Sequence, residues 1–256
     1  MKILAIGNSF SQDELRFLHG IAKSAGQEVM TANLYIGGCS LETHIKNIRE
    51  NASLYEYQLN GWFTGEYISI DDALKREDWD IVFTHQASAF AGVERTYYPY
   101  LTLLLEKIKQ IRPNAEIWLD ETWAYEYSST HEGFSIYKKD SRFMHARVKE
   151  ICEKVAKDNS LPLIYSGDAV NAVKSLKEFD SEHGGQSLYR DGFHMHLIYG
   201  RYLLGCLLYE TLVKGNVLDA PFIAYDEEAE PADIKLLELI KYTVHGFMLN
   251  KKNIKK

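Results

Sequence analysis

Residues 2–11 read Lys-Ile-Leu-Ala-Ile-Gly-Asn-Ser-Phe-Ser, and this stretch decides how the chain is expected to fold. The apolar run Ile3–Ile6 predicts a short strand buried on both faces, and Gly7-Asn8-Ser9 predicts the turn that ends it. Apolar residues then recur at helical spacing over about 12–25, before Gly26. A buried strand, a tight turn and an amphipathic helix in this order are typical of an α/β fold.

The same alternation continues along the chain. Further apolar segments predict strands near 29–36, 80–84, 116–119 and 161–165. Amphipathic segments predict helices near 97–111, 141–157 and 197–214. Five strands separated by helices predict a parallel sheet that helices cover on both faces. We expect a single domain over residues 1–256, because no internal repeat or Pro-, Gly- or Ser-rich linker divides the sequence.

Three segments exceed what five strand–helix units need: insertions near 51–76 and 125–140, and an added C-terminal helix over 231–249. Within the first insertion, Asn60-Gly61 is typical of a β-hairpin turn, so we expect a small antiparallel ribbon there. Because the two insertions follow the second and fourth strands, we expect them to wall a site at the strand ends.

Composition excludes several classes of protein. Hydrophobic residues make up 46% and charged residues 25%, which is close to the globular average and excludes a disordered, collagen-like or coiled-coil chain. Asp and Glu number 36 against 29 Lys and Arg, for a net charge of −7, and this balance argues against a nucleic-acid partner. No apolar run is long enough for a membrane span, so no membrane partner is expected.

The cysteines and the N-terminus add two further expectations. Cys39, Cys152 and Cys206 show no paired spacing, so neither a disulfide framework nor a zinc knuckle is predicted. The N-terminal apolar run is too short for a signal peptide and is followed by no small-residue cleavage site. A cytoplasmic protein is therefore expected, unless a leader precedes this sequence in the native protein; no particular oligomeric state is predicted.

Polar residues follow each predicted strand, where ligands of an open parallel sheet bind. Taken singly, a serine here is more often a helix cap, a Gly-Gly pair a turn, and a histidine a structural residue. Together, a hydroxyl, a histidine with a carboxylate three residues before it, and free amide donors are the parts that acyl transfer needs. The segments concerned are Gly7-Asn8-Ser9, Gly37-Gly38, His85-Gln86, Asp120–Trp123 and Asp191-Gly192-Phe193-His194.

Each part has a predicted role. Ser9 would be the nucleophile, and His194 the base that takes its proton near neutral pH. Asp191 would hold one imidazole tautomer and stabilise the imidazolium that forms. The backbone N–H groups of Ser9 and Gly38, with the side-chain amide of Gln86, would form the oxyanion hole.

These residues resemble a known family. Gly7-Asn8-Ser9-Phe10-Ser11, Gly38 and Asp191–His194 resemble blocks I, II and V of the SGNH (GDSL-like) hydrolase superfamily, and Gly200–Leu203 resembles a branch known only as a domain of unknown function. The similarity spans residue 2 to about residue 214. It implies a three-layer α/β/α flavodoxin-like fold with strand order 2-1-3-4-5, and an ester hydrolase with a Ser-His-Asp triad.

The sequence departs from the family pattern in its third block. The family has Gly-x-Asn-Asp there, whereas this chain has His85-Gln86-Ala87-Ser88 after its third strand. The resemblance implies that Gln86 takes the place of the oxyanion asparagine. Asn8 also stands where the family's eponymous motif has aspartate, as is common in this branch.

Residues after the third and fourth strands suggest the substrate. Trp123 is expected on the rim beside Glu121, with His85 near them. An exposed aromatic ring among polar groups suits a sugar, which stacks its apolar face and hydrogen-bonds through its hydroxyls. We therefore predict that the enzyme removes acetyl or other short acyl groups from a carbohydrate or small-molecule ester, without a cofactor or metal.

Three other interpretations stay open. Asp191, His194 and His196 could ligate a metal together with His85 or His183, although no further metal motif accompanies them. The Gly7–Ser9 turn could cradle a phosphate, but it lacks the glycine pattern of nucleotide sites. The scaffold could also serve a non-catalytic carbohydrate- or ligand-binding protein.

Overall fold

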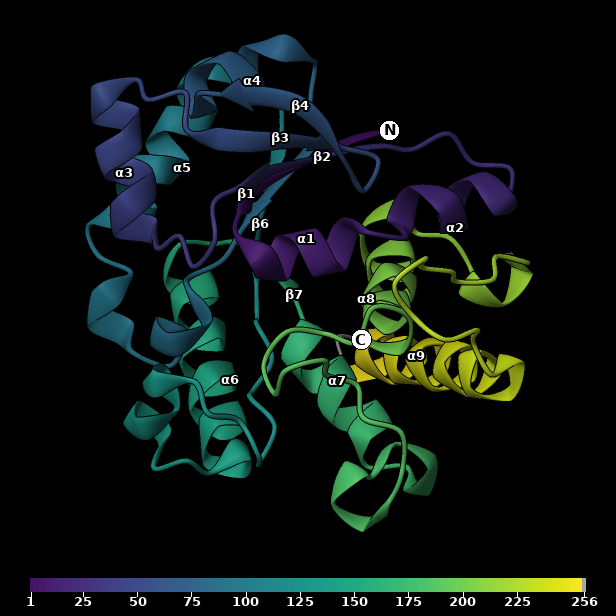
Figure 1. Ribbon diagram of the computed structural model, residues 1–256. Helices are drawn as coiled ribbons and strands as arrows, with labels where there is room; N and C mark the ends of the chain where they lie inside the picture. Colours follow the sequence, from purple (N-terminus) through teal and green to yellow (C-terminus); the bar gives the residue numbers. More distant parts are fainter. Residues whose placement is uncertain (255–256) are drawn as a thin grey trace.

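The first strand, β1 (Lys2–Gly7), is buried along nearly its whole length and lies in the middle of a seven-stranded sheet. The computed structural model describes residues 1–254, and Figure 1 shows helices on both sides of this sheet. The strands are ordered β4-β3-β2-β1-β5-β6-β7. The five parallel ones are β1, β2 (Met30–Tyr35), β5 (Ile81–Thr84), β6 (Glu116–Asp120) and β7 (Leu163–Ile164).

The parallel strands confirm the predicted fold class and the predicted order 2-1-3-4-5. The predicted number of strands was too small, because the hairpin continues the same sheet. Strand β3 (Tyr55–Leu59) pairs antiparallel with β2, and β4 (Trp62–Ile68) forms the edge. Asn60 and Gly61 form the turn between β3 and β4. Their φ angles of 52° and 86° are the left-handed pair that a two-residue hairpin requires.

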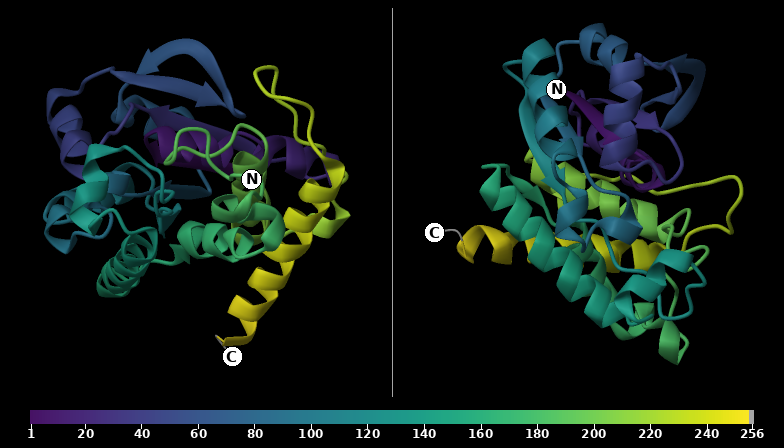
Figure 2. Two further views of the ribbon diagram at one scale, coloured as in Figure 1. Left: turned by 60° about the horizontal axis from the view of Figure 1, so that its bottom comes forward. Right: turned by 90° about the vertical axis from the view of Figure 1, so that its left-hand side faces the viewer.

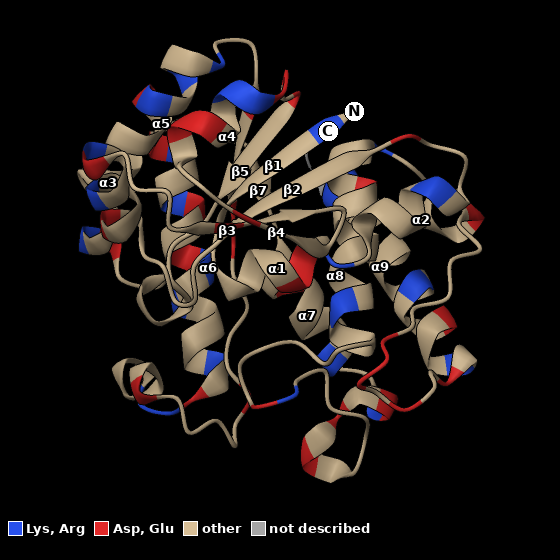
Figure 3. Cartoon of the chain, turned by 45° about the horizontal axis from the view of Figure 1, so that its top comes forward, with Lys and Arg blue, Asp and Glu red and all other residues tan. Residues whose placement is uncertain are grey.

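The helices form two groups on opposite sides of the sheet (Figures 1 and 3). One group packs around α8 (Tyr199–Leu208) and contains α1 (Ser9–Leu15), α2 (Leu18–Ser24), α7 (Ser166–Lys174) and α9 (Ile234–Ile254). The other contains α3 (Leu41–Glu50), α4 (Ile70–Arg76), α5 (Tyr100–Ile111) and α6 (Ser141–Asp158). Figure 2 shows α9 along the outside of the group around α8, with its last turns extending beyond the other helices.

One predicted helix is interrupted. The expected helix over 12–25 is instead α1 and α2, which are separated at Arg16 and Phe17. The hairpin turn packs against this break: the guanidinium of Arg16 donates to the Gly61 carbonyl, and a Cβ on Gly61 would lie 2.5 Å from the Arg16 carbonyl oxygen. Within residues 1–254, no helix is both long and apolar enough to cross a lipid bilayer.

Candidate active site

Ser9 is the first residue of α1 and lies directly after the turn that ends β1. The Asn8 side chain caps the helix by accepting the Phe10 N–H at 2.9 Å, and the Ser11 hydroxyl accepts the Asn8 N–H at 3.1 Å. A Cβ on Gly7 would lie 2.3 Å from the Ser11 oxygen, so only glycine fits this tight turn. The local sequence thus fixes Ser9 at the carboxyl end of the central strand.

The structure brings Ser9, His194 and Asp191 into one hydrogen-bonded chain. The Ser9 Oγ lies 2.9 Å from His194 Nε2, and His194 Nδ1 lies 2.6 Å from Asp191 Oδ2. The other Asp191 oxygen accepts the backbone N–H groups of Phe193 and His194 at 3.1 and 2.7 Å. Burial alone would raise the pKa of Asp191, but the hydrogen bonds from His194 and Phe193 outweigh it and lower that pKa. Asp191 is therefore an anion held against one ring nitrogen while the other faces Ser9.

A cavity of about 480 Å³ opens above this triad, and we call it the serine pocket. Ser9 and His194 line it, and residues from three other segments, 35–38, 87–90 and 131, complete it. Gly38 has a φ of 65°, and a Cβ there would meet nothing within 4 Å. The remaining lining residues are Asn8, Phe10, Tyr35, Gly37, Ala87, Ser88, Ala89, Phe90, His131 and Phe193.

Two backbone groups can serve as oxyanion donors at this pocket. As the first helical residue, Ser9 has an N–H without an acceptor in its own helix. Gly38 lines the pocket, and its N–H has no hydrogen-bond acceptor within the described residues. Both groups are free for a negatively charged oxygen beside Ser9.

Gln86 does not reach the pocket, contrary to the expected third donor. Its side-chain oxygen accepts the N–H groups of Leu41 and Ala87 at 3.1 and 2.8 Å, and its amide nitrogen donates to the Thr96 carbonyl at 2.7 Å. The side chain is buried, and these bonds fix the loop after β5 against α3. The prediction failed because a buried carboxamide satisfies its own hydrogen bonds first.

The three expected substrate-binding residues also lie beneath the surface rather than on the rim. Trp123 is fully buried; its ring stacks on Phe10 at 4.0 Å, and its Nε1 donates to the Phe193 carbonyl at 2.8 Å. His85 is buried under Gly7, and burial lowers its pKa to about 4. Glu121 is buried after β6, where its N–H donates to the Ile164 carbonyl at 2.9 Å, and it does not line the pocket. The prediction that these three side chains are exposed to bind substrate was therefore wrong, because all three are buried.

Other residues take the expected places on the wall. Tyr35 ends β2, Phe90 is exposed in the loop after β5, and Phe193 and His131 contact each other with ring centroids 4.7 Å apart. Tyr35 and Phe193 could have been found from the sequence, since each directly adjoins a strand end or the histidine motif. His131 belongs to the second insertion, which carried no local signal for its position.

Glu14, Asp120 and Glu121 form a second polar group at the end of β6, which we call the carboxyl cluster. All three carboxyl groups are buried. The Ser166 hydroxyl lies 2.6 Å from Asp120 Oδ1 and 3.1 Å from Glu14 Oε1. Burial raises the pKa of Asp120 to about 7 and raises that of Glu14 well above its ordinary range. Both carboxyls therefore hold a proton more tightly than exposed carboxyls do.

Glu121, His145 and Asp168 offer ligand atoms within 4.8 Å of one another, the spacing of a metal site. However, the ammonium groups of Lys149 and Lys251 lie 2.8 and 2.7 Å from Asp168 Oδ2. Although burial opposes it, hydrogen bonds from His145 and these two lysines hold the pKa of Asp168 well below its usual range. We interpret the group as an ion-pair cluster that ties α6, α7 and α9 together.

The alternative metal ligands are not brought together around the triad. The Nδ1 of His196 accepts the Ile198 N–H at 3.1 Å at the start of α8. His183 is exposed and pairs with Asp180 at 2.7 Å, while His85 lies buried below β1. Among the described residues, these side chains point to separate structural partners.

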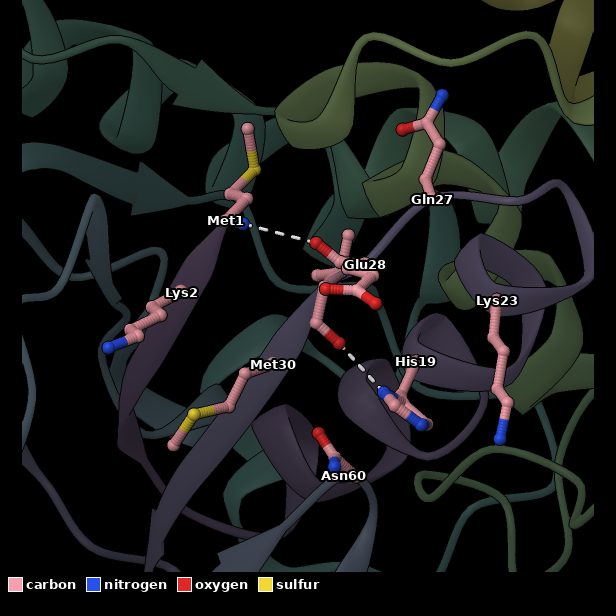
Figure 4. A pocket seen from close by; sticks show the side chains of 9 residues that line it. Met1, Lys2, His19, Lys23, Gln27, Glu28, Met30 and Asn60 are labelled. Carbon is pink, nitrogen blue, oxygen red and sulfur yellow. Dashed lines mark hydrogen bonds between the residues drawn. The ribbon is translucent and has the colours of Figure 1, made fainter.

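A further cavity of about 420 Å³ lies at the opposite end of β1 and β2 (Figure 4). The Met1 ammonium donates to the Glu28 carbonyl at 3.1 Å, and His19 Nδ1 lies 2.7 Å from the Val29 carbonyl oxygen. Its described lining holds no arrangement of nucleophile, base and carboxylate like that at Ser9.

Comparisons with known proteins identify the family of this chain and solved structures that share its fold. A family model described as a domain of unknown function, DUF4886, matches residues 2–235. A DUF4886 family protein from Bacteroides uniformis is similar, with 31% identity, a TM-score of 0.87, and coverage of 97% of this chain and 95% of that one. No curated protein matches.

More distant structures share the fold. A putative SGNH hydrolase from Slackia heliotrinireducens is 22% identical with a TM-score of 0.55, covering 83% of this chain and 98% of that one. Axe2, an acetylxylan esterase from Geobacillus stearothermophilus, is 14% identical with a TM-score of 0.53, covering 82% and 92%. At these identities the likeness concerns the fold.

Proposed function

Because the chain belongs to the DUF4886 family and has the fold of SGNH hydrolases, we propose that it is a serine ester hydrolase. One observation carries the proposal: Ser9 Oγ, His194 and Asp191 form a continuous hydrogen-bonded chain at the base of an open pocket. Such a chain activates a hydroxyl that is a weak nucleophile on its own.

The mechanism follows from these contacts. His194 Nε2 takes the Ser9 proton as Oγ attacks the ester carbonyl carbon, and Asp191 stabilises the imidazolium. The N–H groups of Ser9 and Gly38 bind the oxyanion. His194 then gives its proton to the leaving alkoxide, which leaves an acyl group on Ser9. Water, deprotonated by His194, attacks this acyl-enzyme, releases the acid and restores Ser9.

The pocket walls support a short acyl group on a sugar or similar polar alcohol as the substrate. Aromatic rings of Tyr35, Phe90 and Phe193 line a cavity that also contains the Ser88 hydroxyl and His131. Aromatic faces and hydrogen-bonding groups together suit a sugar ring. The resemblance of the fold to an acetylxylan esterase is consistent with this class.

The decisive experiment combines covalent labelling with turnover. A fluorophosphonate should label the wild-type protein at Ser9, and p-nitrophenyl acetate should be hydrolysed. Ser9→Ala should abolish both while leaving the circular dichroism spectrum and Tm unchanged. A wild-type protein that is neither labelled nor active would instead indicate a ligand-binding protein on the same scaffold, and full activity of Ser9→Ala would refute the assignment.

The substrate class is tested separately by varying the length of the acyl chain and the alcohol part of the ester. Acetyl esters should be hydrolysed with a higher kcat/KM than octanoyl esters, and peracetylated xylose should compete with p-nitrophenyl acetate. A preference for octanoyl esters would contradict the carbohydrate assignment but would leave the assignment of the catalytic triad unaffected.

A further inference from the structure

Asp13 lies one helical turn after Ser9 on α1, so both side chains project from the same face of that helix. The Asp13 side chain is completely buried. Its two oxygens accept the Arg190 guanidinium at 2.9 and 3.0 Å and the Arg201 Nε at 2.8 Å. It also accepts the backbone N–H of Met195 at 3.0 Å. A buried carboxylate with this many donors is fixed in position.

The residues that Asp13 binds flank the two other members of the triad. Arg190 directly precedes Asp191, and Met195 directly follows His194. Between them, the Arg190 N–H donates to the His194 carbonyl at 3.0 Å, and the Arg190 guanidinium also donates to the Met195 carbonyl. Asp13 therefore holds the first and last residues of the segment that contains both Asp191 and His194.

The buried charges continue away from the pocket. Arg201, on α8, also contacts Asp226 at 3.2 Å, and Asp226 contacts Arg16 at 3.4 Å. Figure 3 shows acidic residues of α1 beside a basic turn of α8. Asp226 shares Arg201 with Asp13, but among the described residues it forms no hydrogen bond or ion pair with residues 190–195. The chain thus contains a matched carboxylate that shares the ion pairs without holding the catalytic segment.

We propose that Asp13, with Arg190, is a positioning residue that sets the distance between Ser9 Oγ and His194 Nε2. The inference rests on the proposed esterase function. Ser9 and Asp13 belong to one rigid helical turn, so fixing residues 190–195 to Asp13 fixes His194 relative to Ser9. Because a misplacement of about 1 Å can reduce a rate by about a hundredfold, this contact controls turnover.

The test compares Asp13→Asn and Arg190→Gln with the control Asp226→Asn, using p-nitrophenyl acetate across pH. In Asp13→Asn, kcat should fall about a hundredfold, and in Arg190→Gln about tenfold, with KM within about twofold of wild type. The midpoint of the acid limb of kcat should stay unchanged, because the Asp191–His194 bond lies within the segment itself. Asp226→Asn should keep kcat within about twofold even where its Tm falls.

Equal kcat in the folded Asp13→Asn and wild-type enzymes, or equal losses in Asp13→Asn and Asp226→Asn, would overturn the proposal. If Asp13→Asn does not fold, the kcat of Arg190→Gln tests the proposal instead. This variant should fold, because the Arg190 side chain is 26% exposed and Asp13 keeps its ion pair with Arg201. A wild-type kcat in Arg190→Gln then refutes it.

Amide hydrogen exchange separates this proposal from the proposed function. Residues 190–195 should exchange faster in Asp13→Asn and Arg190→Gln than in Asp226→Asn, whether or not the protein hydrolyses esters. Exchange rates of residues 190–195 that are the same in the two variants as in Asp226→Asn would refute the positioning role of Asp13 and Arg190. An inactive wild type with faster exchange in the two variants would refute only the esterase assignment.

Discussion

Ser9, after β1, and Glu121, after β6, occupy equivalent places at the same edge of the parallel sheet, yet their surroundings differ. Ser9 lines an open pocket, whereas both carboxyl oxygens of Glu121 are buried without a hydrogen-bond partner among the described residues. The start of α7 causes the difference: the Gly167 N–H donates to the Glu121 carbonyl at 2.8 Å, and a Cβ on Gly167 would lie 2.7 Å from Glu121 Oε1. A polar residue at a strand end can contact a ligand only where the neighbouring helices leave that position open.

The contrast predicts that substitutions in the serine pocket change turnover and that substitutions in the carboxyl cluster change stability alone. After Ser9→Ala, the largest effect should come from Asp191→Asn, which should lower kcat by about 10³- to 10⁴-fold because the His194 tautomer is no longer fixed. Ester hydrolysis and fluorophosphonate labelling should fall together. Asp120→Asn, a matched substitution in the carboxyl cluster, should leave kcat within about twofold of the wild-type value. An equal loss of kcat in both variants would show that the two regions do not differ in their effect on turnover.

An intermediate effect is expected from Trp123→Phe, which keeps a ring against Phe10 but removes the N–H bonded to the Phe193 carbonyl. Because this carbonyl belongs to the catalytic segment, we expect kcat to fall about tenfold. Trp118→Phe is the matched control, since Trp118 Nε1 is buried without a hydrogen-bond partner among the described residues. Similar kcat values for the two variants would show that the indole N–H does not position the segment.

The smallest effect on turnover should come from Glu121→Gln, which we expect to change stability only. Burial, followed by the charges of Asp168 and Asp120, raises the pKa of Glu121 well above its ordinary value. The folded state therefore holds this proton more tightly than the unfolded chain, and the group's contribution to stability is lost as pH rises through the folded pKa.

Urea unfolding at pH 5 and pH 8 checks this sign. The free energy of unfolding of wild type relative to that of Glu121→Gln should be more favourable at pH 5 than at pH 8, with kcat unchanged, because the two proteins share every other titrating group. A loss of kcat in Glu121→Gln would place the residue in the catalytic machinery after all.

Features that are encoded by short stretches of the sequence could be predicted. The five parallel strands and the placement of Ser9, Asp191 and His194 at strand ends follow from the strand–helix alternation and from short motifs, whereas the strand order was implied by the resemblance to the SGNH superfamily. Tyr35 could have been added, because the last residue of a strand beside a glycine turn faces the same edge.

Features set by contacts distant in sequence could not be predicted. The break between α1 and α2 depends on Gly61 of the hairpin, and the partners of Gln86 depend on the path of the loop to Thr96. The pairing of β3 with β2 depends on which strand edge is left open, which no local pattern encodes. Trp123 was misplaced for the same reason, because burial by Phe10 and the Phe193 carbonyl is a tertiary property.

The parallel stack of Trp123 on Phe10, with an interplanar angle of 2°, also gives the protein an optical signal of its own. The indole touches the residue next to Ser9 on one side and bonds the backbone next to His194 on the other. Acylation of Ser9 or movement of the histidine changes the surroundings of this indole, which is one of four tryptophans in the chain. The part of the fluorescence emission that is lost in Trp123→Phe can therefore follow each turnover in a stopped-flow instrument, without a dye and with the natural substrate.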